Sequence, residues 1–213
     1  MKTKTLFPYS PQEEKLNVYS HALGLLLSLF ALVLLFAKAI EAADVLSYFA
    51  YLSYGISLVL LYAASTFYHN AKQEKQRRRL KVLDHTAIYL LIAGTYMPYS
   101  LLGIGGHWGF IIAIMVVFIA LIGVVLKLFF TGRFELASTL SYVFLGGIVL
   151  VAIKPLIEHM PAMALSYLVI GGVFYLVGAV LYSISKIPLN HAIFHFFVLL
   201  GSTCHFLGVI WYI

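Results

Sequence analysis

The chain has 213 residues, of which 62% are hydrophobic, 15% aromatic and only 10% charged. About a quarter of an ordinary soluble protein is charged, so this composition excludes a water-soluble domain and indicates an integral membrane protein. The single cysteine, Cys204, excludes an internal disulfide and leaves His, Asp and Glu as the ligands for any metal. The net charge of +6 is scattered over the ends of apolar segments, so we expect membrane lipid as the partner and no nucleic acid.

Seven apolar stretches are long enough, at about 20 residues each, to cross a bilayer as helices. They predict spanning helices at 18–39, 45–69, 82–102, 108–130, 136–153, 162–185 and 190–213. These stretches use nearly the whole chain, so we expect an all-α membrane protein with one seven-helix transmembrane domain over residues 1–213. The first stretch is too long for the apolar region of a cleavable signal peptide and is expected to remain as a helix.

The distribution of Lys and Arg predicts the orientation of these helices. Only Lys38 and Lys154 fall on one side of the membrane. The other 12 of the 14 bases share the side of the N-terminus: Lys2, Lys4, Lys15, Lys72, Lys75, Arg77, Arg78, Arg79, Lys81, Lys127, Arg133 and Lys186. The positive-inside rule therefore places the N-terminus in the cytoplasm and the C-terminus outside, opposite to a G-protein-coupled receptor. The basic loop is interpreted as a determinant of this topology in preference to a specific site for anionic lipid.

Polar side chains gather at the predicted cytoplasmic ends of four helices. Ionisable residues within a bilayer are costly, so each of them is a functional hypothesis. They are Asn17, Ser20 and His21 at the start of the first helix, His69 at the end of the second, Asp84 at the start of the third, and His191 and His195 near the start of the seventh. We therefore expect one polar site at this end of the bundle.

Three of these histidines have the pattern of a metal site. His191 and His195 are four residues apart on one helix face, which brings their Cβ atoms to about 5–6 Å. His69 supplies a third nitrogen if the second and seventh helices meet. Three histidines with one open position are the ligand set of a catalytic zinc site, so the sequence predicts zinc bound by His69, His191 and His195.

Two further residues are candidates for catalysis. Asp84 is expected to accept a hydrogen bond from a ligand or to act as general base on water at the metal, although a lone Asp at a helix start is more often an N-cap. Ser65 lies one turn before His69 and could orient that water. It could equally bond back to the carbonyl oxygen of Leu61.

The remaining candidates lie around this group. Asn17, His21 and His85 are expected to contact the ligands or Asp84 rather than the metal. His21 is also at the correct depth to be a fourth ligand, but a contact of the first helix is favoured. His205 follows His195 by ten residues, about 15 Å along a helix, so we expect it to be a separate buried hydrogen-bonding residue.

Short motifs in four helices resemble the hemolysin III family, the bacterial branch of the progestin and adiponectin receptor superfamily, which is linked to the alkaline ceramidases. The similarity covers nearly the whole chain. The matching pieces are Glu14-Lys15-Leu16-Asn17-Val18-Tyr19-Ser20-His21, Ser65-Thr66-Phe67-Tyr68-His69, Leu83-Asp84-His85 and His191-Ala192-Ile193-Phe194-His195. The resemblance implies zinc at His69, His191 and His195, Asp84 near the metal, and the same inside-out topology.

Two functions are consistent with this pattern. The first is a membrane-embedded zinc hydrolase of lipid amide or ester bonds, similar to a ceramidase and acting in lipid homeostasis of a bacterial plasma membrane. The alternative is a non-enzymatic pore-forming or lipid-sensing protein in which a structural zinc ties two helices together. Structural zinc sites are usually closed by four protein ligands, so an open fourth position would favour the hydrolase and His21 in that position would favour the tie.

Overall fold

The computed structural model describes residues 9–213, and the described chain is almost entirely helical. Six of its helices are long and apolar enough to cross a membrane, and a bent pair raises the number to seven if it is one span. The helices are α1 (Pro11–Ala42), α2 (Val45–Asn70), α3 (Glu74–Met97), α4 (Gly106–Phe130), α5 (Glu135–Gly147), α6 (Ile153–His159), α7 (Ala162–Ser183) and α8 (Asn190–Tyr212). The predicted all-helical membrane fold is therefore confirmed.

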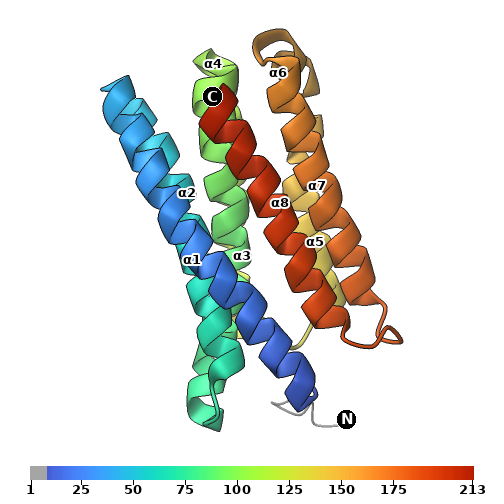
Figure 1. Cartoon of the computed structure of the whole chain (residues 1–213). Coiled ribbons are helices and arrows are strands. Elements are labelled where there is room, and N and C mark those ends of the chain that lie inside the picture. Colours follow the sequence, from blue (N-terminus) through green and yellow to red (C-terminus); the bar gives the residue numbers. More distant parts are fainter. Residues whose placement is uncertain (1–8) are drawn as a thin grey trace.

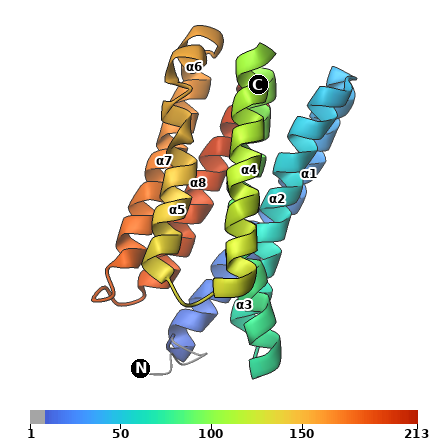
Figure 2. The same cartoon turned by 180° about the vertical axis from the view of Figure 1, so that it is seen from behind.

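The long helices lie side by side in one bundle (Figures 1 and 2). The helix α1 packs against α2 and α8, α2 packs against α3, α3 against α4, and α7 against α8. The start of α1 and the C-terminus lie at opposite ends of the bundle (Figure 1). This arrangement agrees with an odd number of crossings, in which the bent pair α5 and α6 is one span.

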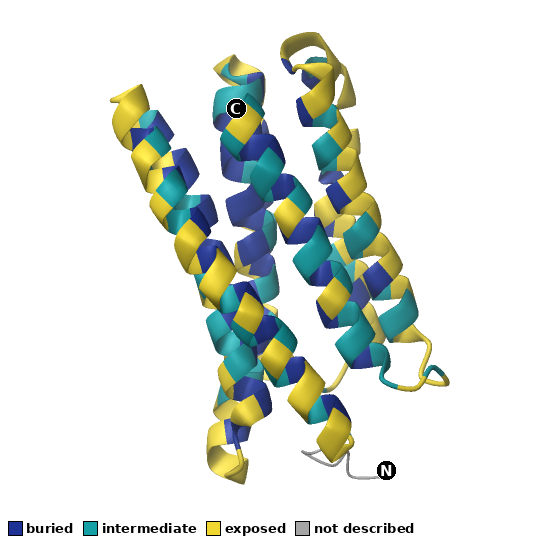
Figure 3. Ribbon diagram, in the orientation of Figure 1, coloured by how far each residue is buried: buried dark blue, intermediate teal, exposed yellow. Residues whose placement is uncertain are grey.

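The outer surface of the bundle is apolar and the polar side chains face inward. Large side chains such as Phe30, Val33 and Phe118 are more than 60% exposed, as expected where lipid replaces water (Figure 3). Inside, small residues let helices approach closely. A Cβ atom on Gly24 of α1 would lie 2.4 Å from the ring of Tyr62 on α2, so glycine is required at this crossing.

The helix α1 begins seven residues earlier than the predicted start at residue 18. Ser10 caps it by accepting a hydrogen bond from the Glu13 backbone N–H at 3.2 Å, and Pro11 occupies the first helical position. Glu13 and Glu14 fall in the first turn, where carboxylates interact favourably with the helix dipole. The polar segment before the apolar stretch is therefore helical and brings two acids to the end of the bundle.

The helix α3 also begins earlier than predicted, at Glu74 rather than at residue 82. The basic run predicted as a loop forms its first turns, because Arg77 folds back and donates to the carbonyl oxygens of His69 and Ala71 at 3.5 and 3.3 Å. These bonds satisfy the last carbonyls of α2. Asp84 consequently lies inside α3, and its interpretation as an N-cap is wrong because the cap position is Gln73.

The predicted fifth helix, 136–153, is broken. The helix α5 ends at Gly147, a 3₁₀ turn follows at Ile148–Leu150, and α6 continues to His159 at an angle of 51°. Gly146 and Gly147 have low helix propensity, and Pro155 lacks a backbone donor and is tolerated only in the first turn of α6. The span therefore changes direction here.

The arrangement predicts opposite locations for the two chain ends. In intact cells, a tag on the N-terminus should be protected from a membrane-impermeant reagent and a tag on the C-terminus should react, because 12 of the 14 bases share the N-terminal side. Permeabilised cells, in which both tags react, are the control. Protection of both tags in intact cells would contradict an odd number of crossings.

Candidate metal centre

The three histidines of the predicted metal site come together where α1 and α8 begin. His69 lies in the last turn of α2, and His191 and His195 lie in the first two turns of α8. One ligand atom from each lies within 4.8 Å of the other two, and all three side chains are buried. The condition that His69 lies close to His191 and His195 is therefore met, and the group could bind a metal ion.

The spacing of two ring nitrogens suits a single small ion. The Nε2 atoms of His69 and His191 lie 3.1 Å apart. Two nitrogens bound to one tetrahedral ion at about 2.0–2.1 Å would be about 3.3 Å apart. The two imidazoles therefore need to move only a few tenths of an ångström to share a metal.

Each of the three histidines has an oxygen near its other ring nitrogen. The pairs are His69 Nδ1 with Glu14 Oε2 at 2.7 Å, His191 Nδ1 with Tyr9 Oη at 3.1 Å, and His195 Nδ1 with Ser20 Oγ at 3.4 Å. The Glu14 carboxylate can only accept a hydrogen bond, so the Nδ1 atom of His69 carries the proton. Metal-binding histidines commonly have such partners, because the outer hydrogen bond fixes the tautomer that leaves the Nε2 lone pair for the ion.

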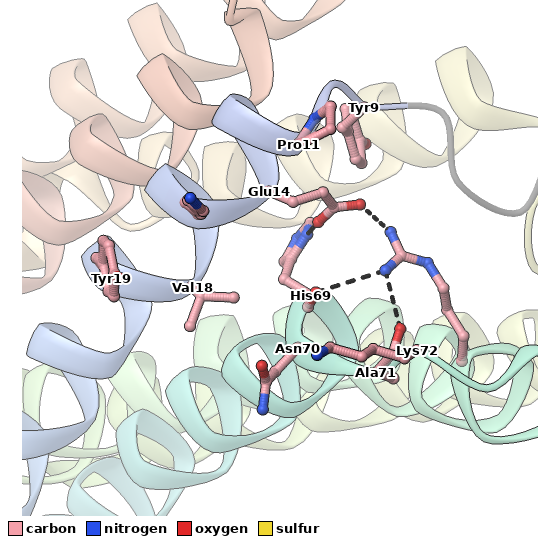
Figure 4. A pocket seen from close by; sticks show the side chains of 11 residues that line it. Tyr9, Pro11, Glu14, Val18, Tyr19, His69, Asn70, Ala71 and Lys72 are labelled. Atoms are coloured by element: carbon pink, nitrogen blue, oxygen red, sulfur yellow. Dashed lines mark hydrogen bonds and ion pairs between the residues drawn. The ribbon is translucent and has the colours of Figure 1, made fainter.

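Glu14 is held from two sides. It extends from α1 toward His69 (Figure 4), accepts from the His69 ring and forms an ion pair with the guanidinium of Arg77. Arg77 is 1% exposed, so its charge depends on this carboxylate and on the carbonyls it caps. One acid thus connects α1, α2 and α3 at the metal site.

The contacts of Glu14 and Tyr9 with the histidines were not predicted from the sequence. The signal for Glu14 was the Ser10-Pro11 start of α1, because a helix that begins there places Glu14, Asn17 and His21 on one face at intervals of three and four residues. Tyr9 lies before the helix, and its contact with His191 joins residues 182 positions apart in the chain. No local pattern predicts such a contact.

Asn17 and His21 both contact the histidine group. Asn17 is fully buried, and its Nδ2 lies 3.4 Å from His69 Nδ1. The ring of His21 stacks on that of His195 at 3.5 Å and an angle of 14°. His21 does not belong to the three-residue ligand group, so this arrangement agrees with the helix contact rather than with a fourth ligand.

The buried Asp84 and the partly exposed His85 form a pair near the histidines. Asp84 is 8% exposed, and its Oδ2 lies 3.2 Å from Nδ1 of His85. The carboxylate also interacts electrostatically with His69 and His195. Both residues are therefore near the site, and the assignment of Asp84 as a base stays a prediction.

Ser65 is 1% exposed, and its hydroxyl has no hydrogen-bond partner among the described residues. The back-bond to Leu61 is therefore wrong. Asn17 Oδ1 and both ring nitrogens of His21 are also buried, and no residue from 9 to 213 forms a hydrogen bond with them. Buried polar atoms of this kind usually bind water or a ligand, so their number around the histidines indicates that something polar occupies the site. His205 is separate, with its Nε2 atom 3.1 Å from the carbonyl oxygen of Leu168.

Comparison with known proteins identifies relatives over nearly the full chain. The profile of the haemolysin-III related family matches residues 9–206. The protein named Hemolysin-3 of Bacillus cereus is 41% identical over 202 residues, which cover 95% of this chain and 92% of the relative. The Hemolysin-3 homolog of Bacillus subtilis (strain 168) is 40% identical over 204 residues, 96% of each chain.

The geometry predicts about one transition-metal ion per chain in protein purified without chelator. His191→Ala should lose most of that metal, because only two nitrogens remain for the ion. The matched control is His205→Ala, which removes another buried histidine from α8 but lies outside the ligand group. Elemental analysis of the purified proteins measures the difference, and equal metal in both variants would contradict the site.

Proposed function

The chain belongs to the haemolysin-III related family, and from this premise we propose that it is a zinc-dependent hydrolase that cleaves an amide or ester bond of a membrane lipid. Its apolar helices and its bacterial relatives identify it as an integral membrane protein of a bacterial plasma membrane. The observation that carries the proposal is the ligand group of three buried histidines, without a fourth metal-binding side chain among the described residues. A three-ligand set leaves a position for water or substrate, whereas structural zinc is usually enclosed by four.

The donor atoms support zinc as the metal. Imidazole nitrogen is a preferred zinc ligand, and burial at 7% exposure or less excludes competing water from the three rings. When bound, zinc supplies a Lewis acid that polarises a carbonyl group and lowers the pKa of water to about 7. Glu14, Tyr9 and Ser20 keep the three imidazoles in position for it.

Asp84 is the proposed general base. Its carboxylate is buried close to His69 and His195, and it does not belong to the ligand group. A carboxylate in that position can take a proton from water and deliver it to the leaving amine or alcohol. The Nδ1 atom of His85 lies 3.2 Å from this carboxylate, within ion-pair distance.

The unpartnered polar atoms form the proposed contacts with substrate. The Ser65 hydroxyl can donate, and Asn17 Oδ1 can accept from an amide N–H or a hydroxyl group. His21 can do either through its two free ring nitrogens. A lipid amide offers both a carbonyl acceptor and an N–H donor, whereas an ester offers the acceptor and depends on a neighbouring hydroxyl group as donor. The acyl chains of either lipid are compatible with the apolar helix surfaces that lead to this end of the bundle.

A second candidate is a non-enzymatic membrane protein in which zinc ties two parts of the bundle. The ligands come from α2, which packs within the group α1 to α3, and from α8, which packs mainly on α7. A metal shared by these helices would add a link between α2 and α8, which also meet where the Tyr62 hydroxyl donates to Ser202 Oγ at 2.8 Å. Pore formation or lipid sensing, suggested by the name hemolysin of the relatives, belongs to this candidate.

Asp84→Asn distinguishes the two candidates. The change keeps the size of the side chain but removes the base, so zinc should remain bound while release of fatty acid from a bacterial lipid extract falls by about 10²-fold or more. Zinc content, melting temperature and fatty-acid release of the purified protein are the measurements. Asp44→Asn is the matched control, because Asp44 caps α2 at the opposite end of the bundle.

The second candidate, a non-enzymatic protein in which zinc only links helices, predicts a different result. If zinc only joins helices, Asp84→Asn should leave the cellular lipid phenotype unchanged, while His191→Ala should lower that phenotype and the melting temperature together, since metal binding contributes to folding. An Asp84→Asn protein that holds zinc, melts normally and keeps full activity would remove the proposed base and favour the second candidate.

A further inference from the structure

A cavity of about 470 Å³ opens beside His69, between α1, the end of α2 and the first turns of α3. Figure 4 shows Glu14 and His69 on its walls, with Val18 and Tyr19 farther along α1. The volume lies in the usual range for small-molecule sites, about 300–1,000 Å³. A ligand in this cavity would therefore be in contact with one of the three metal-binding histidines.

The wall of this cavity carries an excess of positive charge. Its charged residues are the acid Glu14 and the bases Lys15, Lys72 and Arg77. Glu14 and Arg77 form an ion pair, whereas Lys15 and Lys72 have no hydrogen bond or ion pair with any described residue. Lys15 of α1 and Lys72 of the connection between α2 and α3 thus line one cavity, and no described carboxylate pairs with either ammonium group, which favours a phosphate or another anionic group.

The other end of the cavity is lined by apolar and aromatic side chains that suit contact with lipid. Val18 and Tyr19 follow Lys15 within about one turn of α1, and Tyr19 is 68% exposed on the outer face of the helix. Tyrosine is enriched where a membrane protein passes from headgroups to hydrocarbon. A ligand that is anionic at the lysines and apolar beyond them fits this sequence of side chains.

We propose that the cavity binds the headgroup phosphate of an anionic glycerophospholipid from the leaflet on the N-terminal side. Lys15 and Lys72 contact the phosphate, and the acyl chains leave along Val18 and Tyr19. Lys72 therefore has a local role besides its contribution to topology. Binding requires no hydrolysis. Only the conclusion that this lipid is the substrate, with its ester bonds next to His69, rests on the proposed function.

The test uses the purified, metal-loaded full chain in phosphatidylcholine vesicles with and without phosphatidylglycerol. Native mass spectrometry after detergent extraction measures the fraction of protein that retains phosphatidylglycerol. The double variant Lys15→Gln/Lys72→Gln should retain about tenfold less than wild type, because each base near an anionic surface contributes appreciably to attraction. Work at physiological salt limits the contribution of charges outside the cavity.

The matched control is Lys75→Gln/Arg79→Gln, which removes the same charge from exposed positions of α3 that do not line the cavity. It should retain phosphatidylglycerol nearly as well as wild type. An equal loss in both double variants would overturn the proposal in favour of a general surface attraction. Glycerol 3-phosphate that raises the melting temperature as much as phosphatidylglycerol does, without acidic lipid, would assign the cavity to a soluble phosphate and overturn the lipid occupant.

The experiment distinguishes a failure of the proposed lipid binding from a failure of the proposed hydrolysis. Asp84→Asn should retain phosphatidylglycerol like wild type, whether or not the protein is a hydrolase, because Asp84 does not line the cavity. If wild-type protein retains lipid normally but releases no fatty acid, the proposed binding site is supported and the proposed hydrolase activity is ruled out. If wild-type protein releases fatty acid and all variants retain lipid equally, the hydrolase activity is supported and the proposed binding site is ruled out.

Discussion

The hydrogen bond between Glu14 and His69 determines how the N-terminal end of the bundle is assembled. The carboxylate comes from the first turn of α1, the imidazole from the last turn of α2, and the guanidinium of Arg77 on α3 binds the same carboxylate. Removal of one partner would leave a buried charge uncompensated, which typically costs about 3–5 kcal/mol. The same bond fixes the tautomer of His69, so the fold of three helices and the chemistry of the candidate metal site depend on one side chain.

The position of the metal site followed from the sequence because two constraints act together. Helix geometry places His191 and His195 on one face, and the alternation of spans brings His69 to their depth. Asp84 was assigned to the same depth for a partly wrong reason, since it lies inside α3 rather than at its start. The extra turns of α3 are charged, and hydropathy detects the apolar part of a helix rather than its aqueous extension.

Hydropathy also gave no indication of the residues that contact the histidines and their partners. Glu14 precedes the apolar stretch of α1, and Arg77 belongs to a run of bases that the positive-inside rule explains without any further role. Their partners depend on how the helix ends pack, as the bonds from Arg77 to the carbonyls of α2 illustrate. The stacking of His21 on His195 is equally a product of tertiary packing, and it agrees with a helix contact, while the role of His21 at a bound metal stays a prediction.

The arrangement joins a polar site to a lipid-facing surface. The histidines are buried at one end of the bundle, while the cavity beside His69 passes from Lys15 and Lys72, which form no ion pair with any described residue, to the exposed ring of Tyr19. A soluble hydrolase must extract its lipid from the bilayer. A site built into helix ends can instead receive the headgroup region of a lipid that remains in the membrane.

We propose that His69, His191 and His195 hold one metal ion and leave one coordination position open. X-ray absorption spectroscopy at the zinc edge of the purified protein tests it directly. The account predicts three imidazole nitrogens at about 2.0–2.1 Å and one additional light ligand that is not imidazole. Four imidazoles would bring His21 into the ligand set and contradict the open position, and sulfur ligation or the absence of bound metal would contradict the site itself.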